Sequence, residues 1–271
     1  MTTVRTTAEV RLEGRGLQVA YDGRAVLADL DIRLPTGRFT AVVGPNACGK
    51  STLLRTLARI LSPVQGTVLL DGRPITDRSS KEVARTLGLL PQAPVVVDGI
   101  VVEDLVARGR FPHQSLLRQW SRADERAVES AMRRAGVLDL RDRVVDELSG
   151  GQRQRVWIAM ALAQETSLLL LDEPTTFLDL AHQVEVLDLC ADLVESGTTV
   201  VAVLHDLNLA FRYADHVVVM HDGELVAQGT PAEVVDAELL ERVFALPCRV
   251  VPDPETRTPL VVPLARSRRC D

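Results

Sequence analysis

The stretch GPNACGKST occupies residues 44–52 and decides the fold prediction for this chain. A continuous apolar run, FTAVV at 39–43, comes directly before it and predicts a buried strand. Apolar residues on one helical face come after it and predict a helix from Lys50 to about Ile60. A glycine loop of the form G-x-x-x-x-G-K-[ST] between a strand and a helix is typical of a phosphate-binding loop. The alternative interpretation is an ordinary glycine turn that opens a helix.

Lys50 is one of only two lysines in a chain with 31 basic residues, the other being Lys81. Arginine presents a rigid planar fork, whereas lysine reaches a phosphate as a compact charge on a flexible stem. We therefore predict that Lys50 contacts the β- and γ-phosphates of a nucleotide and that the Ser51 hydroxyl binds Mg²⁺. Backbone N–H groups of the loop and the helix N-terminus favour the same anion. The predicted nucleotide-binding residues of the loop are Gly44, Pro45, Asn46, Ala47, Cys48, Gly49, Lys50, Ser51 and Thr52.

Composition and charge indicate a soluble globular protein without a large nucleic-acid surface. Hydrophobic residues make up 46% and charged residues 25% of the 271 residues, which are ordinary globular values, and the net charge is −6. The N-terminal stretch MTTVRTTAEVRLEGRG lacks the apolar core of a signal peptide, and no apolar run approaches the length of a membrane span. The four cysteines, at 48, 190, 248 and 270, form no C-x-x-C pair, so we expect reduced thiols and a cytoplasmic location.

Alternation of apolar and polar residues predicts antiparallel strands and hairpins in three regions. These regions are 10–43, with turns at 22–23 and 36–37, then 66–75, with a turn at 71–72, and 217–229, with a turn at 222–223. The middle of the chain, 100–164, is helical in character and includes an amphipathic helix at 123–135. Two apolar strands at 168–171 and 198–204 flank a helix at 181–193, and this β-α-β order predicts a parallel sheet. We therefore expect an α/β fold with a parallel core, a helical insertion and an antiparallel sheet.

A second candidate site is LLLLDEP at 168–174, where the predicted strand ends in Asp172 and Glu173. The carboxyl edge of a parallel sheet is where ligands bind. Asp172 suits a contact to Mg²⁺, and Glu173 suits a base that orients and deprotonates an attacking water. The alternative for an acid pair after a strand is a helix N-cap or surface charge. Combined with Lys50, the pair predicts a nucleoside triphosphate hydrolase or a switch driven by a nucleoside triphosphate.

The stretch LSGGQRQR at 148–155 is a second glycine-rich turn at the start of a helix, which we expect at 153–163. Such a turn presents backbone N–H groups and is another potential anion site. One chain has little use for two phosphate sites on one nucleotide, whereas a dimer in which each turn covers the partner's nucleotide would use both. The alternative is a loop that only caps the helix.

GPNACGKST, LSGGQRQR, LLLLDEP and a later His205 follow one another in an order that resembles the nucleotide-binding subunit of an ABC transporter. The resemblance runs through nearly the whole chain. It implies a P-loop NTPase fold, namely an ABC ATPase core with a parallel sheet, an antiparallel β subdomain and an α-helical insertion subdomain. It also implies ATP and Mg²⁺ as cofactors. We expect the core with its antiparallel subdomain at 8–93 and 164–236, the helical signature subdomain at 94–163 and a C-terminal extension at 237–271.

Three further residues of the nucleotide site are assigned by this resemblance. Tyr21 matches the aromatic residue that stacks on adenine, with a plain strand aromatic as the alternative. Gln92, in LLPQAP, matches the glutamine that links the Mg²⁺ and water site to the transmembrane partner, and alone it would be an ordinary surface residue. His205 matches the switch histidine that senses the γ-phosphate, with a capped turn residue as the alternative. The expected catalytic residues are Glu173, His205, Gln92 and Lys50, and the expected metal contacts are Ser51, Gln92 and Asp172.

The resemblance assigns the remaining residues to contacts across a dimer. Ser149, Gly150 and Gly151, with Gln152, match the signature that contacts the γ-phosphate held by the other subunit. Asp179, in TTFLD, matches an aspartate of the dimer contact. The implied assembly is a homodimer of ATPase subunits that docks on two transmembrane permease subunits and serves, indirectly, a substrate-binding protein.

Four further stretches resemble the importer branch that serves ferric siderophores, haem and cobalamin, and within it the siderophore importers most. They are VVEDLVARGRFPH at 101–113, TTFLDLAHQVEVLDL at 175–189, VLHDLNLAFRYADHVVVM at 203–220 and DPETRTPLVVPL at 253–264. The resemblance implies a peripheral ATPase at the cytoplasmic face of the membrane that powers uptake of a ferric siderophore. A cobalamin or haem importer is the alternative, since none of these residues contacts the cargo.

An alternative from another class is a soluble ABC ATPase that acts on nucleic acid or ribosomes. Such proteins usually carry two cassettes in one chain or long coiled-coil inserts, whereas this chain has one cassette, no heptad run and an acidic balance. We therefore expect no nucleic-acid partner. A small-molecule kinase would leave the LSGGQ stretch without a function, and an inactive nucleotide sensor is disfavoured because no catalytic position is missing.

Overall fold

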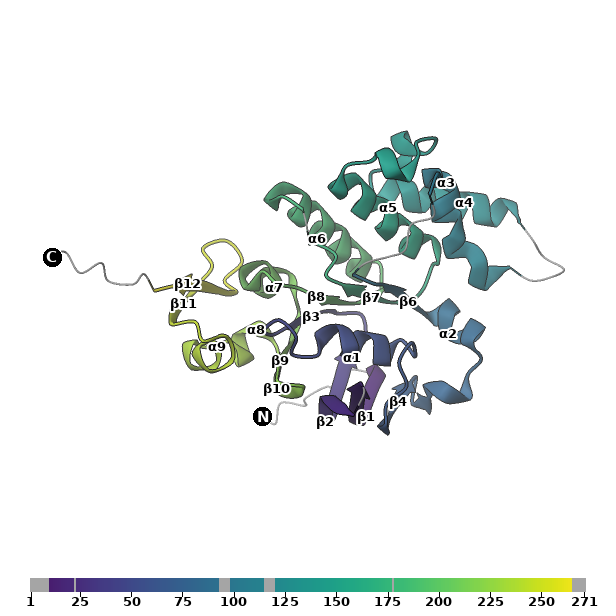
Figure 1. Ribbon diagram of the computed structural model, residues 1–271. Coiled ribbons are helices and arrows are strands. Elements are labelled where there is room, and N and C mark those ends of the chain that lie inside the picture. The colour runs from purple at the N-terminus through teal and green to yellow at the C-terminus, as the bar shows by residue number, and fades with distance from the viewer. Residues whose placement is uncertain (1–9, 22, 93–97, 115–119, 177, 265–271) are drawn as a thin grey trace, which may run out of the picture.

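The centre of the protein is a six-stranded sheet (Figure 1). The structure is a computed structural model, and it describes residues 10–21, 23–92, 98–114, 120–176 and 178–264. The strand order is β10-β9-β3-β8-β7-β6. Neighbouring strands pair in parallel except for β10, which pairs antiparallel with β9. The strands are β3 (Phe39–Val43), β6 (Leu87–Leu90), β7 (Leu168–Asp172), β8 (Thr199–Val203), β9 (His216–His221) and β10 (Glu224–Gly229).

The parallel strands are buried on both faces, which explains their continuous apolar sequence. Successive side chains of a strand point to opposite faces of the sheet. Leu169 and Leu171 of β7 accordingly lie in one hydrophobic cluster, whereas Leu168 and Leu170 lie in the other. The carboxyl ends of β3, β6, β7 and β8 therefore reach the same edge of a rigid sheet.

A second, four-stranded antiparallel sheet has the order β2-β1-β4-β5. Its strands are β1 (Val10–Tyr21), β2 (Arg24–Pro35), β4 (Gln65–Leu70) and β5 (Arg73–Pro74). Helix α1 (Lys50–Leu57) lies between the two sheets (Figure 1). Leu53, Leu54 and Leu57 of α1 are fully buried in a cluster that also contains Leu12 of β1 and Leu168 of β7. This packing fixes the N-terminus of α1 at the edge where the parallel strands end.

Helices make up most of the segment between β6 and β7 and most of the remaining connections. That segment contains α3 (Val102–Ala107), η2 (Arg108–His113), α4 (Arg122–Arg134), η3 (Leu138–Leu140), η4 (Val145–Glu147) and α5 (Gly150–Ala163). Elsewhere lie η1 (Ile75–Asp77), α2 (Ser80–Thr86), α6 (Leu180–Glu195), α7 (Leu207–Tyr213), α8 (Pro231–Val234), α9 (Ala237–Phe244) and the hairpin β11 (Cys248–Pro252) with β12 (Pro259–Pro263). Among the described residues, no helix has both the length and the apolar character needed to cross a membrane.

The main sequence predictions are confirmed. The strands at 168–171 and 198–204 are parallel neighbours, the region at 217–229 forms an antiparallel hairpin, and the helix at 123–135 is α4. The α/β fold with a parallel core, an antiparallel sheet and a helical insertion is therefore correct. Asp22, Cys270 and the boundary at 93–94 lie outside the described residues.

Two predictions are wrong in detail. The helix after the phosphate loop ends at Leu57 and not near Ile60, because Arg59 adopts a left-handed backbone conformation with φ of 61°. The turn at Thr36-Gly37 does not close a hairpin, because β2 belongs to the antiparallel sheet and β3 pairs in parallel with β8 and β9 of the other sheet. That turn instead carries the chain from one sheet to the other.

Candidate functional site

A cavity of about 440 Å³ opens at the carboxyl ends of the parallel strands. Residues from five separate parts of the chain line it: strand β2, the phosphate loop with the start of α1, the segment after β6, the segment after β7 and the segment after β8. The lining residues are Val26, Asn46, Ala47, Gly49, Lys50, Ser51, Thr52, Gln92, Glu173 and His205. Ligands of α/β proteins bind at this edge of the sheet.

The phosphate loop wraps around the ammonium group of Lys50, whose side chain is buried. Its Nζ donates to the backbone carbonyls of Gly44 (2.8 Å) and Pro45 (2.7 Å). Gly49 is the N-cap residue of α1 with φ of 102°, a conformation that glycine adopts without strain. The N–H groups of the first turn of α1 therefore point toward the cavity side of the loop, where a helix N-terminus attracts an anion.

The turn between β9 and β10 supports the phosphate loop from behind. Gly223 donates its N–H to the carbonyl of Cys48 (3.1 Å) and accepts from the N–H of Ala28 (3.1 Å). A Cβ at Gly223 would lie 2.4 Å from the Val26 carbonyl, so only glycine fits there. The sequence predicted this turn, but nothing in the sequence links it to a loop some 170 residues earlier.

Asp172 and Ser51 form the candidate metal site. The Ser51 hydroxyl donates to Asp172 Oδ1 (2.8 Å), while Oδ2 is buried and has no hydrogen-bond partner within the described part of the chain. Burial raises the pKa of the Asp172 carboxyl, and the Ser51 hydroxyl partly opposes this shift. A carboxylate and a hydroxyl are hard oxygen donors of the kind that Mg²⁺ takes, with few protein ligands and substrate phosphates completing its shell. The residues present therefore fit Mg²⁺.

Glu173 is held at the centre of a second group of polar side chains. Its Oε2 accepts from Gln92 Nε2 (2.7 Å) and from the Thr176 hydroxyl (3.1 Å), and its Oε1 lies 2.7 Å from His205 Nε2. The backbone of Glu173 has a positive φ of 56°, a strained conformation that a non-glycine residue adopts where the surroundings impose it. The structure thus brings together the three predicted residues Gln92, Glu173 and His205 in the same cavity as Lys50.

The contact between the Thr176 hydroxyl and Glu173 was not predicted from the sequence. It follows Glu173 by three residues in DEPTT, so a hydroxyl within reach of the carboxylate could have been suspected from the spacing. The turn that brings the hydroxyl back, with the Thr176 N–H donating to the Glu173 carbonyl (3.3 Å), depends on the unusual backbone at Glu173.

The residues predicted to act across a dimer do not line the cavity of this chain. Ser149 is the N-cap of α5 and forms a capping box with Gln152. Asp179 is the N-cap of α6, and its carboxylate accepts from the His182 backbone N–H (3.0 Å). Tyr21, at the end of β1, is 43% exposed and is also absent from the cavity lining. The roles assigned to these residues stay predictions.

The turn at the start of α5 is open to its surroundings. A Cβ built at Gly150 meets no atom within 4 Å, and one built at Gly151 meets only a Leu178 methyl group at 3.4 Å. The space beside Gly150 and Gly151 is therefore open, as a second anion contact would require.

Comparisons with known proteins agree with this geometry. Residues 27–176 match a protein family described as ABC transporter. The chain is 53% identical over 263 residues to the ferric enterobactin transport ATP-binding protein FepC of Escherichia coli (strain K12), with 97% of each chain covered. It is 52% identical over 258 residues to the achromobactin transport ATP-binding protein CbrD of Dickeya dadantii (strain 3937), with 95% and 96% covered. A solved inward-facing conformation of a metal-chelate type ABC transporter is similar with a TM-score of 0.80 at 30% identity, covering 94% of this chain and 98% of that chain.

Proposed function

The chain belongs to the ABC transporter family, and from that membership we propose that it is the ATP-hydrolysing subunit of an importer that powers the uptake of ferric siderophores across the cytoplasmic membrane. The main structural support for ATP hydrolysis is the position of Glu173, which Gln92 and His205 hold in the cavity that the phosphate loop lines. The cargo is inferred from relatives of nearly the same length, whose names refer to siderophore transport.

ATP binds with its phosphates on the loop at 44–52. Lys50 supplies the positive charge, and the N-terminus of α1 adds its partial charge and its N–H groups. Asp172 and Ser51 would hold Mg²⁺, which would neutralise negative charge on the phosphates. Gln92 donates its amide nitrogen to Glu173, and its amide oxygen would be a further metal contact.

Glu173 acts as the base that accepts a proton from the attacking water. Gln92 and Thr176 orient its carboxylate, and His205, which contacts this carboxylate and lines the same cavity, senses the γ-phosphate. Phosphoryl transfer depends mainly on positioning and electrostatic stabilisation, so a preorganised group of this kind suits the reaction.

Two copies of the chain complete two composite sites. The turn at Ser149–Gly151 contacts the γ-phosphate that the partner subunit binds, and Asp179 lies in the dimer contact. Tyr21 stacks on the adenine ring. The dimer closes with ATP and reopens after loss of the γ-phosphate, and both steps move the helical subdomain relative to the core. We propose the helical subdomain at 94–163, the core at 8–93 and 164–236, and a C-terminal extension at 237–271.

The homodimer works on two permease subunits and stands as a peripheral protein at the cytoplasmic face of the membrane. We place the permease contact on the helical subdomain near Gln92, because the proposed closure moves this subdomain relative to the core. A substrate-binding protein delivers the cargo to the permease without contacting this chain.

Uptake measurements in cells that lack the gene test this function. The cells are given catecholate and hydroxamate siderophores loaded with radioactive iron, and labelled cobalamin and haem in parallel, with and without a plasmid copy of the chain. We expect the plasmid copy to restore entry of iron from at least one siderophore and to leave cobalamin and haem uptake unchanged. Restored cobalamin or haem uptake alone would keep the mechanism and replace the cargo. Unchanged uptake of all four, together with salt-sensitive binding of RNA or DNA by the purified chain, would contradict the importer function.

A further inference from the structure

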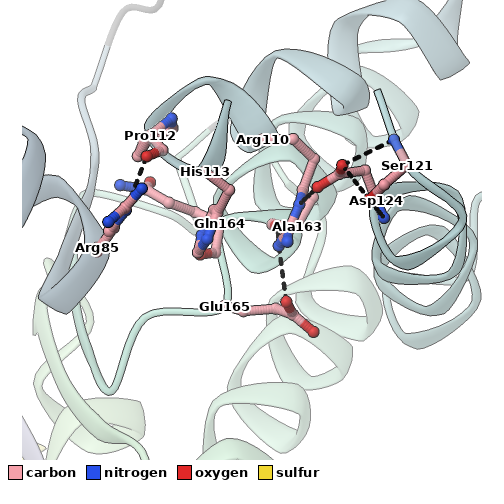
Figure 2. Close-up of polar contacts among 9 residues, drawn as sticks. All are labelled: Arg85, Arg110, Pro112, His113, Ser121, Asp124, Ala163, Gln164 and Glu165. Atoms are coloured by element: carbon pink, nitrogen blue, oxygen red, sulfur yellow. Dashed lines mark hydrogen bonds and ion pairs between the residues drawn. The ribbon is translucent and has the colours of Figure 1, made fainter. Parts of the chain in front are cut away.

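A polar junction with a buried ion pair at its centre ties η2 to α4, α5 and α2 at the end of α5 that lies away from the signature turn. Its members are Arg85, Arg110, His113, Asp124 and Gln164 with their partners (Figure 2). The side chains of Arg110 and Asp124 are only 5% and 4% exposed. An ion pair this deep in a protein is costly to bury, because both charges lose their water. Its presence therefore calls for a role other than stability alone.

Arg110 ties η2 to both α4 and the end of α5. Its Nε donates to Asp124 Oδ1 in α4 (2.9 Å), and its Nη1 donates to the Ala163 carbonyl (2.6 Å) and to Glu165 Oε2 (2.7 Å) at the end of α5. Figure 2 shows the guanidinium between Asp124 on one side and Glu165 on the other. The last carbonyls of a helix carry partial negative charge and lack intrahelical partners. A guanidinium suits this position because its donors are held in one plane and fixed directions.

Asp124 belongs to the junction and also begins α4. Its carboxylate accepts from the Ser121 hydroxyl (2.6 Å) in a capping box as well as from Arg110. Burial raises the pKa of the Asp124 carboxyl, but the hydrogen bonds from Ser121 and Arg110 outweigh burial and keep that pKa below its ordinary value. The carboxylate thus stays charged and holds α4 and η2 in one arrangement.

The neighbours of Arg110 in η2 bring the backbone of η2 directly onto α5. A Cβ at Gly109 would lie 2.2 Å from the Met160 carbonyl of α5, so the two backbones touch there. His113 Nε2 donates to the Gln164 carbonyl (2.8 Å), just after the last residue of α5. The C-terminal end of α5 is therefore held by hydrogen bonds in fixed directions and by close packing.

The same junction reaches the core. Gln164 Nε2 donates to the Ala84 carbonyl of α2 (2.5 Å), and Arg85 Nε of α2 donates to the Pro112 carbonyl (2.9 Å). Lys81 of α2 also donates to the Gln114 carbonyl. Helix α2 runs into β6, after which Gln92 enters the catalytic cavity. The junction thus joins the helical segment to the core through α2.

The geometry of α5 connects the junction with the signature turn. Ser149–Gly151 stand at the N-terminus of α5, and Ala163 stands at its C-terminus. A helix of 14 residues is about 20 Å long, so a small change of direction at the junction displaces the signature turn by a larger distance. Nearer its N-terminus α5 is also tied to the core, by Gln154 Nε2, which donates to the Pro174 carbonyl (3.0 Å), and by the Arg155–Glu185 ion pair (3.3 Å). The junction adds a second fixed point at the far end of the helix.

We propose that Arg110 is a positioning residue of the ATPase cycle, which fixes the direction of α5 at the junction so that Ser149–Gly151 meet the nucleotide bound by the partner subunit. This inference rests on the composite dimer of the proposed function. Arg110 contacts neither nucleotide nor metal ion. Its loss therefore weakens dimer closure and leaves nucleotide binding by the separate subunit intact.

The test uses the full-length chain with Glu173→Gln, in which ATP is bound and not consumed. Light scattering gives the ATP concentration for half-maximal dimer formation, and a fluorescent nucleotide titrated at a protein concentration too low for dimers gives the affinity of the single subunit. The main variant combines Arg110→Met with Asp124→Asn, which removes both charges together and leaves an acceptor oxygen for Ser121. Arg110→Lys is the conservative variant. Arg133→Gln, which breaks an exposed pair on α4, is the matched control.

We expect the double variant to require about tenfold more ATP for dimer formation, at unchanged nucleotide affinity of the single subunit. Arg110→Lys keeps the charge opposite Asp124 but cannot make all three contacts, so the ATP concentration that it needs for dimer formation rises less. If the double variant fails to fold, Arg110→Lys alone tests the proposal. Arg133→Gln should form dimers at the same ATP concentration as the parental chain. Dimer formation by Arg110→Lys and the double variant at the parental ATP concentration would overturn the role of Arg110 and leave the proposed function standing. A parental chain that forms no dimer with ATP would overturn the composite site and this inference with it.

Discussion

Glu173→Gln is expected to lower the rate of ATP hydrolysis by about a thousandfold while ATP binding persists. The amide has nearly the same shape as the carboxylate and can still accept one hydrogen bond from Gln92 or Thr176. It cannot accept a proton from water, and its NH₂ group cannot serve as an acceptor for His205. Phosphate release under saturating ATP measures the rate, and equilibrium titration with ATP measures binding.

A surface acid provides the control for this substitution. Glu129 on α4 is exposed and paired with Arg133, so Glu129→Gln makes the same chemical change away from the cavity and should leave the rate unchanged. If Glu173→Gln hydrolysed ATP as fast as the parental chain, the assignment of Glu173 as the base would be wrong. A loss of ATP binding in the same variant would instead assign Glu173 to the binding of nucleotide.

Lys50→Ala is expected to weaken ATP binding by about a hundredfold or more. Each charge-assisted hydrogen bond to a phosphate oxygen contributes about 1.5–3 kcal/mol, and Lys50 is placed to make more than one. The substitution also removes the donor for the Gly44 and Pro45 carbonyls, so the loop loses the group around which it is wrapped. Isothermal titration with ATP measures the change in affinity.

The second lysine of the chain is the matched control. Lys81→Ala removes the same side chain from α2, where Lys81 donates to a backbone carbonyl and does not line the cavity. ATP affinity should therefore stay at the parental value in Lys81→Ala. Equal ATP affinity in Lys50→Ala and the parental chain would contradict the phosphate contact and the interpretation of residues 44–52.

The members of the candidate catalytic group follow strands of one parallel sheet, although the sequence pattern alone predicted only Glu173, and the resemblance assigned Gln92 and His205. Gln92 comes just after β6, Glu173 just after β7 and His205 just after β8, and these three strands are neighbours. A short apolar run ending in a polar residue is visible in the sequence, and strands that run in parallel bring such residues to one edge. Local pattern and sheet topology therefore agree here.

The supporting contacts could not be predicted in the same way. Gly223 and the phosphate loop touch only because β9 is the parallel neighbour of β3, a pairing that the sequence does not state. Arg110 carries a full charge in a polar stretch and would be placed on the surface by composition, yet it is buried against α4 and the end of α5. The end of α1 was missed because the left-handed conformation at Arg59 has no clear sequence signal.

The central claim is that ATP hydrolysis at Glu173 drives the import of ferric siderophores, and transport into reconstituted vesicles tests it most directly. Permease subunits that copurify from membranes with a tagged copy of the chain are inserted into vesicles, with MgATP enclosed on the side of the ATPase. Radioactive iron bound to the siderophore identified by cellular uptake, with its binding protein, is added on the other side. Iron should accumulate with the parental chain and ATP, and it should stay at the ATP-free level with Glu173→Gln. Equal accumulation with Glu173→Gln, or with ADP in place of ATP, would contradict the account.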